Sequence, residues 1–269
     1  MEHHHHQPYH HDLLADQLFV IANTDRLTLL SEIAVEKQKL SQLTAKLSAT
    51  PQETSRHLML LRNAKLIEKD SAGFFKLTTF GKSMLTLLPS IRFLTQNKDF
   101  FVTHDISSLP EEFIERIGEL RNSTYVKKVG SILAHAQQVL QNAEEYIWLM
   151  ADHPLGGEQF LLSNVDLETT TIVWRIIIPA SSSRSIDWGF LRRAMRNHQG
   201  RIEYCLLDDV NEIKVGIALN EKVAGANFMG NSGELDFGSG FTSNDSLFHK
   251  WCKDLFVIHW NKKGTRVQI

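Results

Sequence analysis

Residues 40–62 read LSQLTAKLSATPQETSRHLMLLR, and their spacing predicts two helices joined by a tight turn. The first helix has one apolar face, formed by Leu40, Leu43 and Leu47. The second helix opens with a capping box, because Thr50 is followed by Pro51 at the first helical position and by Glu53 three residues after the cap. This pattern predicts a helix-turn-helix.

The second helix separates its side chains into two faces. At about 100° per residue, Thr54, Leu58 and Leu61 point inward. The opposite face is short and polar, with Gln52, Ser55, Arg56, Met59 and Asn63. A helix that reads base edges in a major groove needs hydrogen-bonding side chains near its start. An ordinary helical hairpin with a solvated outer face has the same pattern, and residues 40–62 alone leave both readings open.

Residues 66–78 predict two short strands around a turn at Gly73. Lys69 and Lys76 are placed to contact phosphates. A helix-turn-helix followed by a basic hairpin closely resembles the winged helix of ArsR-like and MarR-like regulators, which implies binding of double-stranded DNA. The expected DNA-contacting residues are Thr50, Gln52, Ser55, Arg56, Met59, Arg62, Lys69 and Lys76, with Gln52, Ser55 and Arg56 on bases and Thr50, Arg62, Lys69 and Lys76 on phosphates.

The composition indicates a globular protein of two domains. The chain has 269 residues, 42% of them hydrophobic and 22% charged. Its two cysteines, Cys205 and Cys252, provide no disulfide framework, which fits a reducing cytoplasm, and both are expected to be buried. The longest apolar run, at residues 172–178, is too short to cross a membrane, and the first residues lack the apolar core of a signal peptide.

Charge is divided unevenly along the chain. Residues 12–98 carry 12 Lys and Arg against 8 Asp and Glu, whereas residues 99–269 carry 17 against 22. This favours a DNA-binding N-terminal part and a body that does not bind DNA. The excess of +4 is modest, so we expect two copies of the DNA-binding part to act together in a homodimer.

The N-terminal residues 1–11 are rich in histidine, as in a purification tag or a native His-rich start. A regulatory metal site needs ligands on a rigid frame, so we expect no functional metal and no cofactor. We then expect a winged helix at residues 12–89, connecting helices at 90–125 and an α/β domain at 126–269. A helix from Thr79 through Leu88 should stop at Pro89.

The connection carries the most specific likeness. Ser108 to Glu111 form another capping-box pattern, which predicts a helix through Leu120. The residues from His104 to Pro110, followed by Arg116-Ile117-Gly118-Glu119-Leu120, resemble the junction in archaeal regulators that join a winged helix to a methanogenesis regulatory protein middle domain. This resemblance covers nearly the whole chain. It implies an archaeal, effector-responsive transcriptional regulator.

Apolar residues three and four apart predict one helix of about twenty residues over 126–147: Val126, Val129, Leu133, Ala136, Leu140, Ala143 and Ile147. The helix can pack on its own sheet or form a dimer contact. Further on, strands are predicted at residues 146–150, 171–178, 202–207, 213–219 and 223–228, with helices at 187–198 and 245–259. Such alternation indicates an α/β domain with a mixed sheet packed by helices.

The segment from Asn220 to Asn227, followed by Gly238-Ser239-Gly240, resembles a degenerate phospholipase D signature. Asn220 stands where that chemistry needs a histidine nucleophile, and Asn227 where it needs a carboxylate. An amide cannot attack phosphorus, so no catalytic residue is predicted, although Lys222 is retained. A plain strand–turn–strand hairpin explains the same residues.

Arg175 lies in an otherwise apolar strand beside Trp174 and needs an anionic partner, either an acidic side chain or a small-molecule effector. Overall, the sequence predicts an α+β winged helix-turn-helix domain followed by the α/β domain, acting as a cytoplasmic regulator that is not an enzyme. The alternatives are a nucleic-acid phosphodiesterase and a winged helix that binds protein.

Overall fold

The computed structural model describes residues 11–154, 171–196, 200–209 and 212–269. It divides into two compact units, residues 1–88 and 89–269. Of the His-rich segment at 1–11, only His11 is described, and the end of the helix expected at 187–198 lies outside the described residues. No described helix has the length and apolar character needed to cross a membrane.

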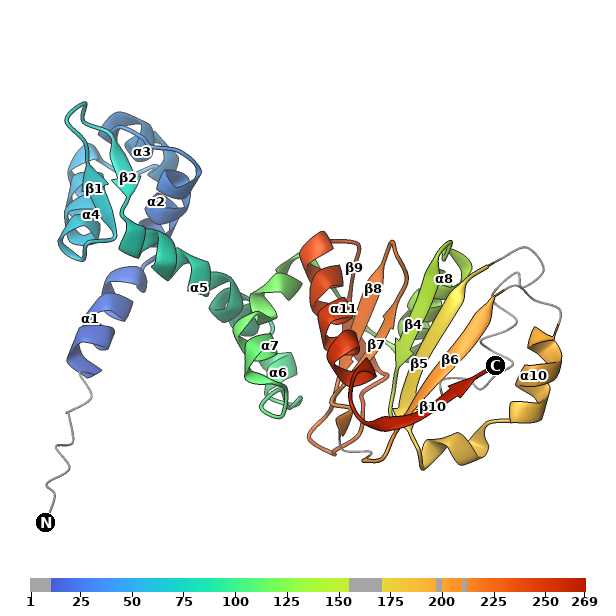
Figure 1. The fold of residues 1–269 in the computed structure, drawn as a ribbon. Helices are drawn as coiled ribbons and strands as arrows, with labels where there is room; N and C mark the ends of the chain where they lie inside the picture. The colour runs from blue at the N-terminus through green and yellow to red at the C-terminus, as the bar shows by residue number, and fades with distance from the viewer. Residues whose placement is uncertain (1–10, 155–170, 197–199, 210–211) are drawn as a thin grey trace, which may run out of the picture. The chain divides into compact units, whose positions relative to one another are not determined.

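The first unit is a winged helix (Figure 1). Its helices are α1 (His11–Ile21), α2 (Thr24–Val35), α3 (Leu40–Leu47), α4 (Pro51–Asn63) and the first part of α5 (Thr79–Gln96). Its hairpin, which we call the wing, is β1 (Ile67–Lys69) paired antiparallel with β2 (Phe75–Leu77). The core joins Leu29, Leu30 and Leu43 to the inward face of α4, as the apolar spacing predicts.

The helix α5 corrects one prediction. It continues to Gln96 with Pro89 inside it, instead of stopping at Leu88. Proline removes one helical hydrogen bond, but tertiary contacts in the second unit hold the following turns. Phe93 is buried there, and the Ser90 hydroxyl donates to the carbonyl of Glu115 at 2.6 Å and accepts from the amide of Gly118 at 3.1 Å.

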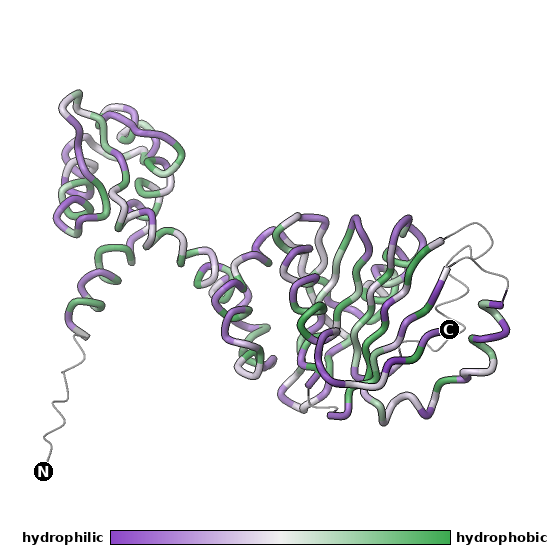
Figure 2. Tube along the Cα trace, in the orientation of Figure 1, coloured by the Kyte–Doolittle hydropathy of each residue, from purple (hydrophilic) through white to green (hydrophobic). Residues whose placement is uncertain are grey.

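The second unit is built on an eight-stranded mixed sheet in the order β10-β6-β5-β4-β7-β8-β9-β3. Its strands are β3 (Thr124–Lys127), β4 (Tyr146–Met150), β5 (Val173–Pro179), β6 (Arg201–Leu207), β7 (Val215–Leu219), β8 (Ala224–Phe228), β9 (Ser239–Ser243) and β10 (Gly264–Gln268). Strands β4, β5 and β6 are parallel, and the remaining pairings are antiparallel. The central strands are mostly hydrophobic (Figure 2), as expected for strands that lie between two hydrophobic cores.

Two hydrophobic cores lie on opposite faces of this sheet. Helix α11 (Ser246–Trp260) covers β7 and β8 on one face, together with α6 (Lys98–Phe101) and α7 (Glu111–Glu115). Helices α8 (Val129–Gln141) and α10 (Trp188–Met195) lie on the other face. Figure 1 shows α11 in front of the sheet and α8 behind it.

The long helix predicted over 126–147 is wrong. Val126 lies in the edge strand β3, which pairs only with β9, and Ile147 lies in β4. The apolar spacing of three and four runs through all three elements, which hides the boundaries at Lys128 and Asn142. Within α8 only the last turn, with Val139 and Leu140, is fully buried, so α8 packs mainly through its C-terminal end.

The helix predicted from a capping box at Ser108 is also wrong in detail. Pro110 is the N-cap and offers no side-chain cap, α7 ends at Glu115, and a 3₁₀ turn over Ile117–Asn122 follows. The structure includes residues 89–125 in the compact second unit, where Phe113 and Ile117 are fully buried. The strands β9 and β10 were not predicted; both contain glycine and polar residues that lack a clear alternation.

Candidate nucleic-acid interface

The start of α4 is held by a reciprocal cap, as the sequence predicts. The Thr50 hydroxyl accepts from the amide of Glu53 at 3.2 Å, and the Glu53 carboxylate accepts from the amide of Thr50 at 3.0 Å. The hydrogen bond from the Thr50 amide, followed by that from its hydroxyl, lowers the pKa of Glu53 below its usual value. The carboxylate therefore stays ionised near the positive end of the helix dipole, which fixes where α4 begins.

The inward face of α4 anchors the helix. Thr54, Leu58 and Leu61 are buried, and the Thr54 hydroxyl donates to the carbonyl of Thr50 at 3.0 Å. The turn before α4 closes through Ser48, which adopts a left-handed conformation with φ of 51°. Burial on one side and the turn on the other leave α4 no freedom to rotate, so its outer face has a fixed orientation.

The outer face of α4 is open, as the sequence predicts. Gln52, Ser55, Arg56, Met59 and Arg62 are exposed in the structure. Within the described part of the chain, no hydrogen bond or ion pair occupies the side chains of Gln52, Ser55, Arg56 or Arg62. Their donors remain available to a ligand that approaches the helix from outside.

The wing places Lys69 beside the ring of Phe75, at 5.5 Å. Its turn is closed by Asp70, whose carboxylate accepts from the amide of Phe74 at 2.8 Å, and by Gly73 at φ of 86°. Lys69 has no carboxylate partner in the part of the chain that the structure describes, whereas Lys76 forms an ion pair of 2.9 Å with Glu68. Of the two predicted wing lysines, Lys69 is therefore the freer cation.

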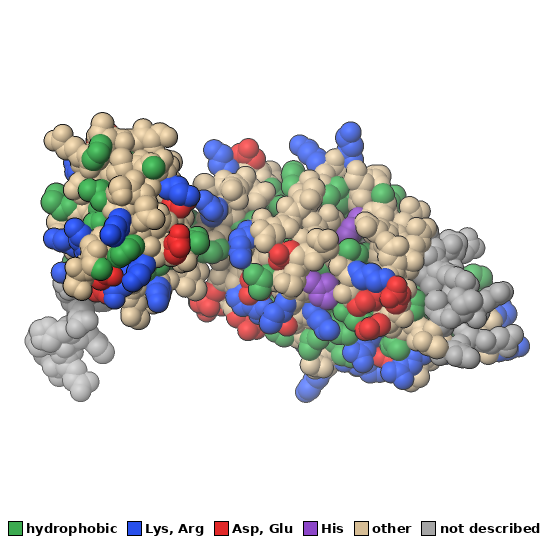
Figure 3. Space-filling view, turned by 90° about the horizontal axis from the view of Figure 1, so that it is seen from above, with side chains coloured by type: hydrophobic (Ala, Val, Ile, Leu, Met, Phe, Trp, Pro, Cys, Tyr) green, Lys and Arg blue, Asp and Glu red, His purple; other side chains and the backbone are tan. Residues whose placement is uncertain are grey.

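Lys37 and Lys39, which are not among the predicted DNA-contacting residues, also lie beside the wing. Gln38 pairs with Phe75 as a short third strand, and this places Lys37 and Lys39 over the ring of Phe74 at 5.0 and 4.9 Å. Lys37 also approaches Asp70 at 3.6 Å, whereas Lys39 has no acidic partner among the described residues. The two lysines close together at residues 37–39 were the sequence feature that could have identified these cations. Figure 3 shows more Lys and Arg than acidic side chains on the visible face of this unit.

The predicted effector residues in the second unit are not brought together. Trp174 is fully buried in one core, while the adjacent Arg175 projects from the opposite face of β5. The anionic partner of Arg175 is Glu203 on the neighbouring strand, at 3.1 Å. Of the two partners expected for Arg175, an acidic side chain or an effector, the structure therefore shows the acidic side chain.

The residues that resemble a phospholipase D signature form a hairpin. The side-chain oxygen of Asn220 accepts from the amides of Lys222 and Val223 at 2.8 and 2.9 Å, which closes the turn between β7 and β8. Asn227 donates to the carbonyl of Ser239 at 2.7 Å and so joins β8 to the β9 segment. Both amides serve structural hydrogen bonds, in agreement with the strand–turn–strand reading.

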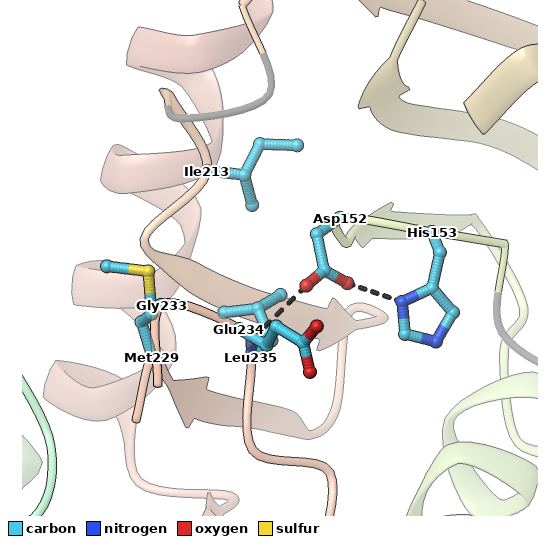
Figure 4. Close-up of a pocket in the computed structure, with 7 residues that line it drawn as sticks. All are labelled: Asp152, His153, Ile213, Met229, Gly233, Glu234 and Leu235. Carbon is cyan, nitrogen blue, oxygen red and sulfur yellow. Dashed lines mark hydrogen bonds and ion pairs between the residues drawn. The ribbon is translucent and has the colours of Figure 1, made fainter. Parts of the chain in front are cut away.

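A pocket of about 360 Å³ lies at the end of β4, beside the start of β7 (Figure 4). The Asp152 carboxylate contacts Nδ1 of His153 at 2.6 Å and accepts from the amide of Leu235 at 3.1 Å. Asp152 therefore orients the imidazole, and Glu234 adds a second carboxylate. The lining residues are Asp152, His153, Ile213, Met229, Gly233, Glu234 and Leu235, which include no Ser, Thr, Cys or Lys nucleophile. No group of three or more potential metal ligands occurs among the described residues.

No protein-family model and no curated protein matches the sequence. Among solved structures, the chain is similar to TrmBL2, described as an archaeal chromatin protein with a novel mode of DNA binding, at 11% identity and a TM-score of 0.41 over 94% of this chain and 98% of that one. It is similar to reduced HlyU from Vibrio cholerae at 26% identity and a TM-score of 0.27, over 30% of this chain and 90% of that one.

The structure of NolR from Sinorhizobium fredii is similar at 24% identity and a TM-score of 0.28, over 30% of this chain and 85% of NolR. A riboflavin-derivative methyltransferase from Streptomyces davawensis reaches a TM-score of 0.26 at 17% identity, over 74% of this chain and 65% of that one. None of these TM-scores reaches 0.5, so the argument for function depends on the site itself.

Proposed function

We propose that the chain is a transcriptional regulator that binds double-stranded DNA through its winged helix and is not an enzyme. The observation that carries the proposal is the outer face of α4, a helix anchored by its buried side, on which Gln52, Ser55 and Arg56 are exposed and have no partner within the described residues. Side chains of this length on the first turns of a helix fit base edges in a major groove. Membership of the archaeal regulator family remains part of this proposal.

The wing supplies the first test. Each phosphate contact that is lost should reduce the slope of log affinity against log salt by about 0.9. We expect Lys39→Gln and Lys69→Gln each to lower the slope for a duplex by about one contact. Lys76→Gln should lower it less, because Glu68 already neutralises Lys76. The measurement is fluorescence anisotropy over a range of salt concentrations.

Equal slopes for these three lysine variants and the unmodified protein would contradict wing contacts with phosphate. Binding that does not weaken with salt at all would favour the alternative of a winged helix that binds protein. A nuclease assay with and without divalent metal tests the phosphodiesterase alternative, for which the pocket offers His153 but no lysine among its lining residues.

We also propose that the chain dimerises through α1. Leu13, Leu14, Leu18 and Phe19 of this helix are exposed, with exposed fractions of 64% for Leu13 and 77% for Phe19. Four exposed large apolar side chains on a helix of 11 residues are costly in water and favour an interface. A second copy is the fitting partner, because two linked recognition helices can bind two half-sites one helical turn of DNA apart.

This interface predicts a change in mass. Phe19→Asp should convert a dimer to a monomer, because it would bury a carboxylate in the apolar contact. The matched control is Val35→Asp, since Val35 is equally exposed but lies alone at the end of α2. Sedimentation of both variants checks the prediction, which is wrong if Phe19→Asp remains a dimer or if both variants dissociate. A response to a small effector stays a prediction, checked by whether a ligand changes DNA affinity.

A further inference from the structure

Part of the sheet in the second unit has an open face, at the first residues of β5 and β6; further along the same side, Ile177, Cys205 and Leu207 are fully buried in the core that includes α11. Helix α11 covers β7 and β8, but no described helix lies in front of β5, β6 and β10 on that side (Figure 1). Strand alternation and register place Arg175, Arg201, Glu203 and Arg266 on this side, and we call it the β5–β6–β10 face. The side chain of Arg201 is 52% exposed and that of Arg175 is 32% exposed.

Cations and aromatic rings alternate at the edge of this face. Lys253 of α11 lies 5.3 Å from the ring of Trp148, and Arg175 lies between Trp148 at 5.4 Å and Trp260 at 5.1 Å. Arg266 completes the row at 4.5 Å from the ring of Trp260. Contacts with rings hold a cation in place without neutralising its charge.

The charges on this face do not balance. Lys253, Arg175, Arg201 and Arg266 share one carboxylate, that of Glu203, which contacts Arg175 at 3.1 Å and Arg201 at 2.9 Å. Arg266 donates to the carbonyl of Trp260 instead of a carboxylate. No other acidic residue occurs in the sequences of β5, β6 and β10. Among these five side chains the excess is three positive charges, although residues 99–269 are acidic overall, and the nearby Glu212 pairs with Lys262 at 2.7 Å.

The shape of the face and the contacts of its aromatic rings indicate the class of ligand that it fits. Two pockets among the described residues lie elsewhere, beside His153 and beside Pro110, whereas this face is one side of a sheet, and a surface of that shape suits an extended polyanion. The Trp260 ring has Arg175 and Arg266 against it, and it also stacks on Phe256. Trp148 likewise stacks on Phe256 and has Arg175 and Lys253 against it, so among the described residues neither tryptophan ring offers a free face for stacking with a nucleic-acid base.

We propose that the β5–β6–β10 face is a second DNA contact, which binds the phosphate backbone of duplex DNA without reading its sequence. Neighbouring strands are about 4.8 Å apart, so the face spans about 10 to 15 Å, enough for several phosphates. The proposal rests on the proposed function insofar as DNA is the partner. In this proposal the second unit adds affinity for duplex DNA of any sequence, and α4 determines the sequence preference.

The experiment compares two double variants of the full chain. The face variant, Lys253→Gln with Arg266→Gln, removes two charges and retains the Arg175–Glu203 pair. The control variant, Arg192→Gln with Arg193→Gln, removes two exposed charges from α10, which packs on the opposite side of the sheet. Binding to a random duplex of about 40 base pairs is measured from about 50 to 200 mM salt. Thermal unfolding verifies that both variants fold.

The face variant should lose about 2 units of salt slope and roughly tenfold or more in affinity, while the control variant retains both. The proposal is overturned if the face variant binds like the unmodified protein, in which case the face serves an acidic protein or only water, or if the control loses as much. The affinity of Arg56→Ala for a preferred DNA sequence is measured separately, because it tests the proposed function independently of the face. If that variant loses affinity and the face variant does not, only this inference fails; if the unmodified protein binds no duplex, the proposed function fails as well.

Discussion

Replacing Arg56 with alanine should reduce affinity for a preferred DNA sequence about tenfold to a hundredfold and relax the preference at one base pair. A bidentate arginine–guanine contact contributes about 1–3 kcal/mol of discrimination. Arg56 is exposed on the second turn of α4 and has no ion pair within the described residues, so its guanidinium is free to make such a contact. In a dimer both recognition helices lose the contact, and the effect on the full operator is larger.

The contrast with Arg62 makes this result specific. Arg62 lies in the last turn of α4, where we expect a phosphate contact, so Arg62→Ala should weaken all sequences alike and lower the salt slope by about 0.9. Arg92→Ala, an exposed arginine of the second unit, should change neither quantity. Selection of bound duplexes from a random pool, followed by anisotropy, measures preference and affinity separately. An unchanged preference after Arg56→Ala would remove α4 as the reading element.

The sequence predicts the local features that short-range chemistry determines. The cap at Thr50, the buried face of α4 and the hairpin at 67–77 are all confirmed, because each depends on residues close in the chain. The strand β4 and the starts of the helices predicted at 187 and 245 are confirmed for the same reason. The partner of Arg175 could not be chosen from sequence, since Glu203 is 28 residues away and only the parallel register places it opposite.

The failures arise where long-range packing overrides local pattern. Pro89 looks like the end of a helix, but contacts of Ser90 and Phe93 in the second unit continue it. Val126 fits a helical apolar stripe, yet pairing with Gly240 makes it part of an edge strand. Lys39 was overlooked as a wing cation because the bridge between Gln38 and Phe75 joins residues 37 apart. Local propensity is a weak guide wherever distant residues supply the burial.

The largest effect on stability is expected from Gly81→Ala in the first unit. A Cβ at this position of α5 would lie 2.0 Å from the backbone carbonyl oxygen of Leu66, the residue before β1. Backbone atoms cannot rotate away as a side chain can, so α5 must separate from the wing. Overpacking costs about 1–3 kcal/mol even where side chains adjust, and we expect at least about 3 kcal/mol here. The better helix propensity of alanine offsets only about 1 kcal/mol.

Gly130→Ala is the matched control, because Gly130 also lies in a helix, α8, and a Cβ there would have no atom within 4 Å. It should leave the protein unchanged or stabilise it by about 0.5–1 kcal/mol. Thermal unfolding of Gly81→Ala should lower the transition of the first unit by about 10–20 °C, and the second unit should keep its own transition. DNA affinity should fall with it, because the Thr78 hydroxyl accepts from the Gly81 amide and donates to the carbonyl of Lys65, so the base of the wing depends on this contact. If Gly81→Ala unfolds at the same temperature as the unmodified protein, then α5 does not pack against the base of the wing as closely as the structure indicates.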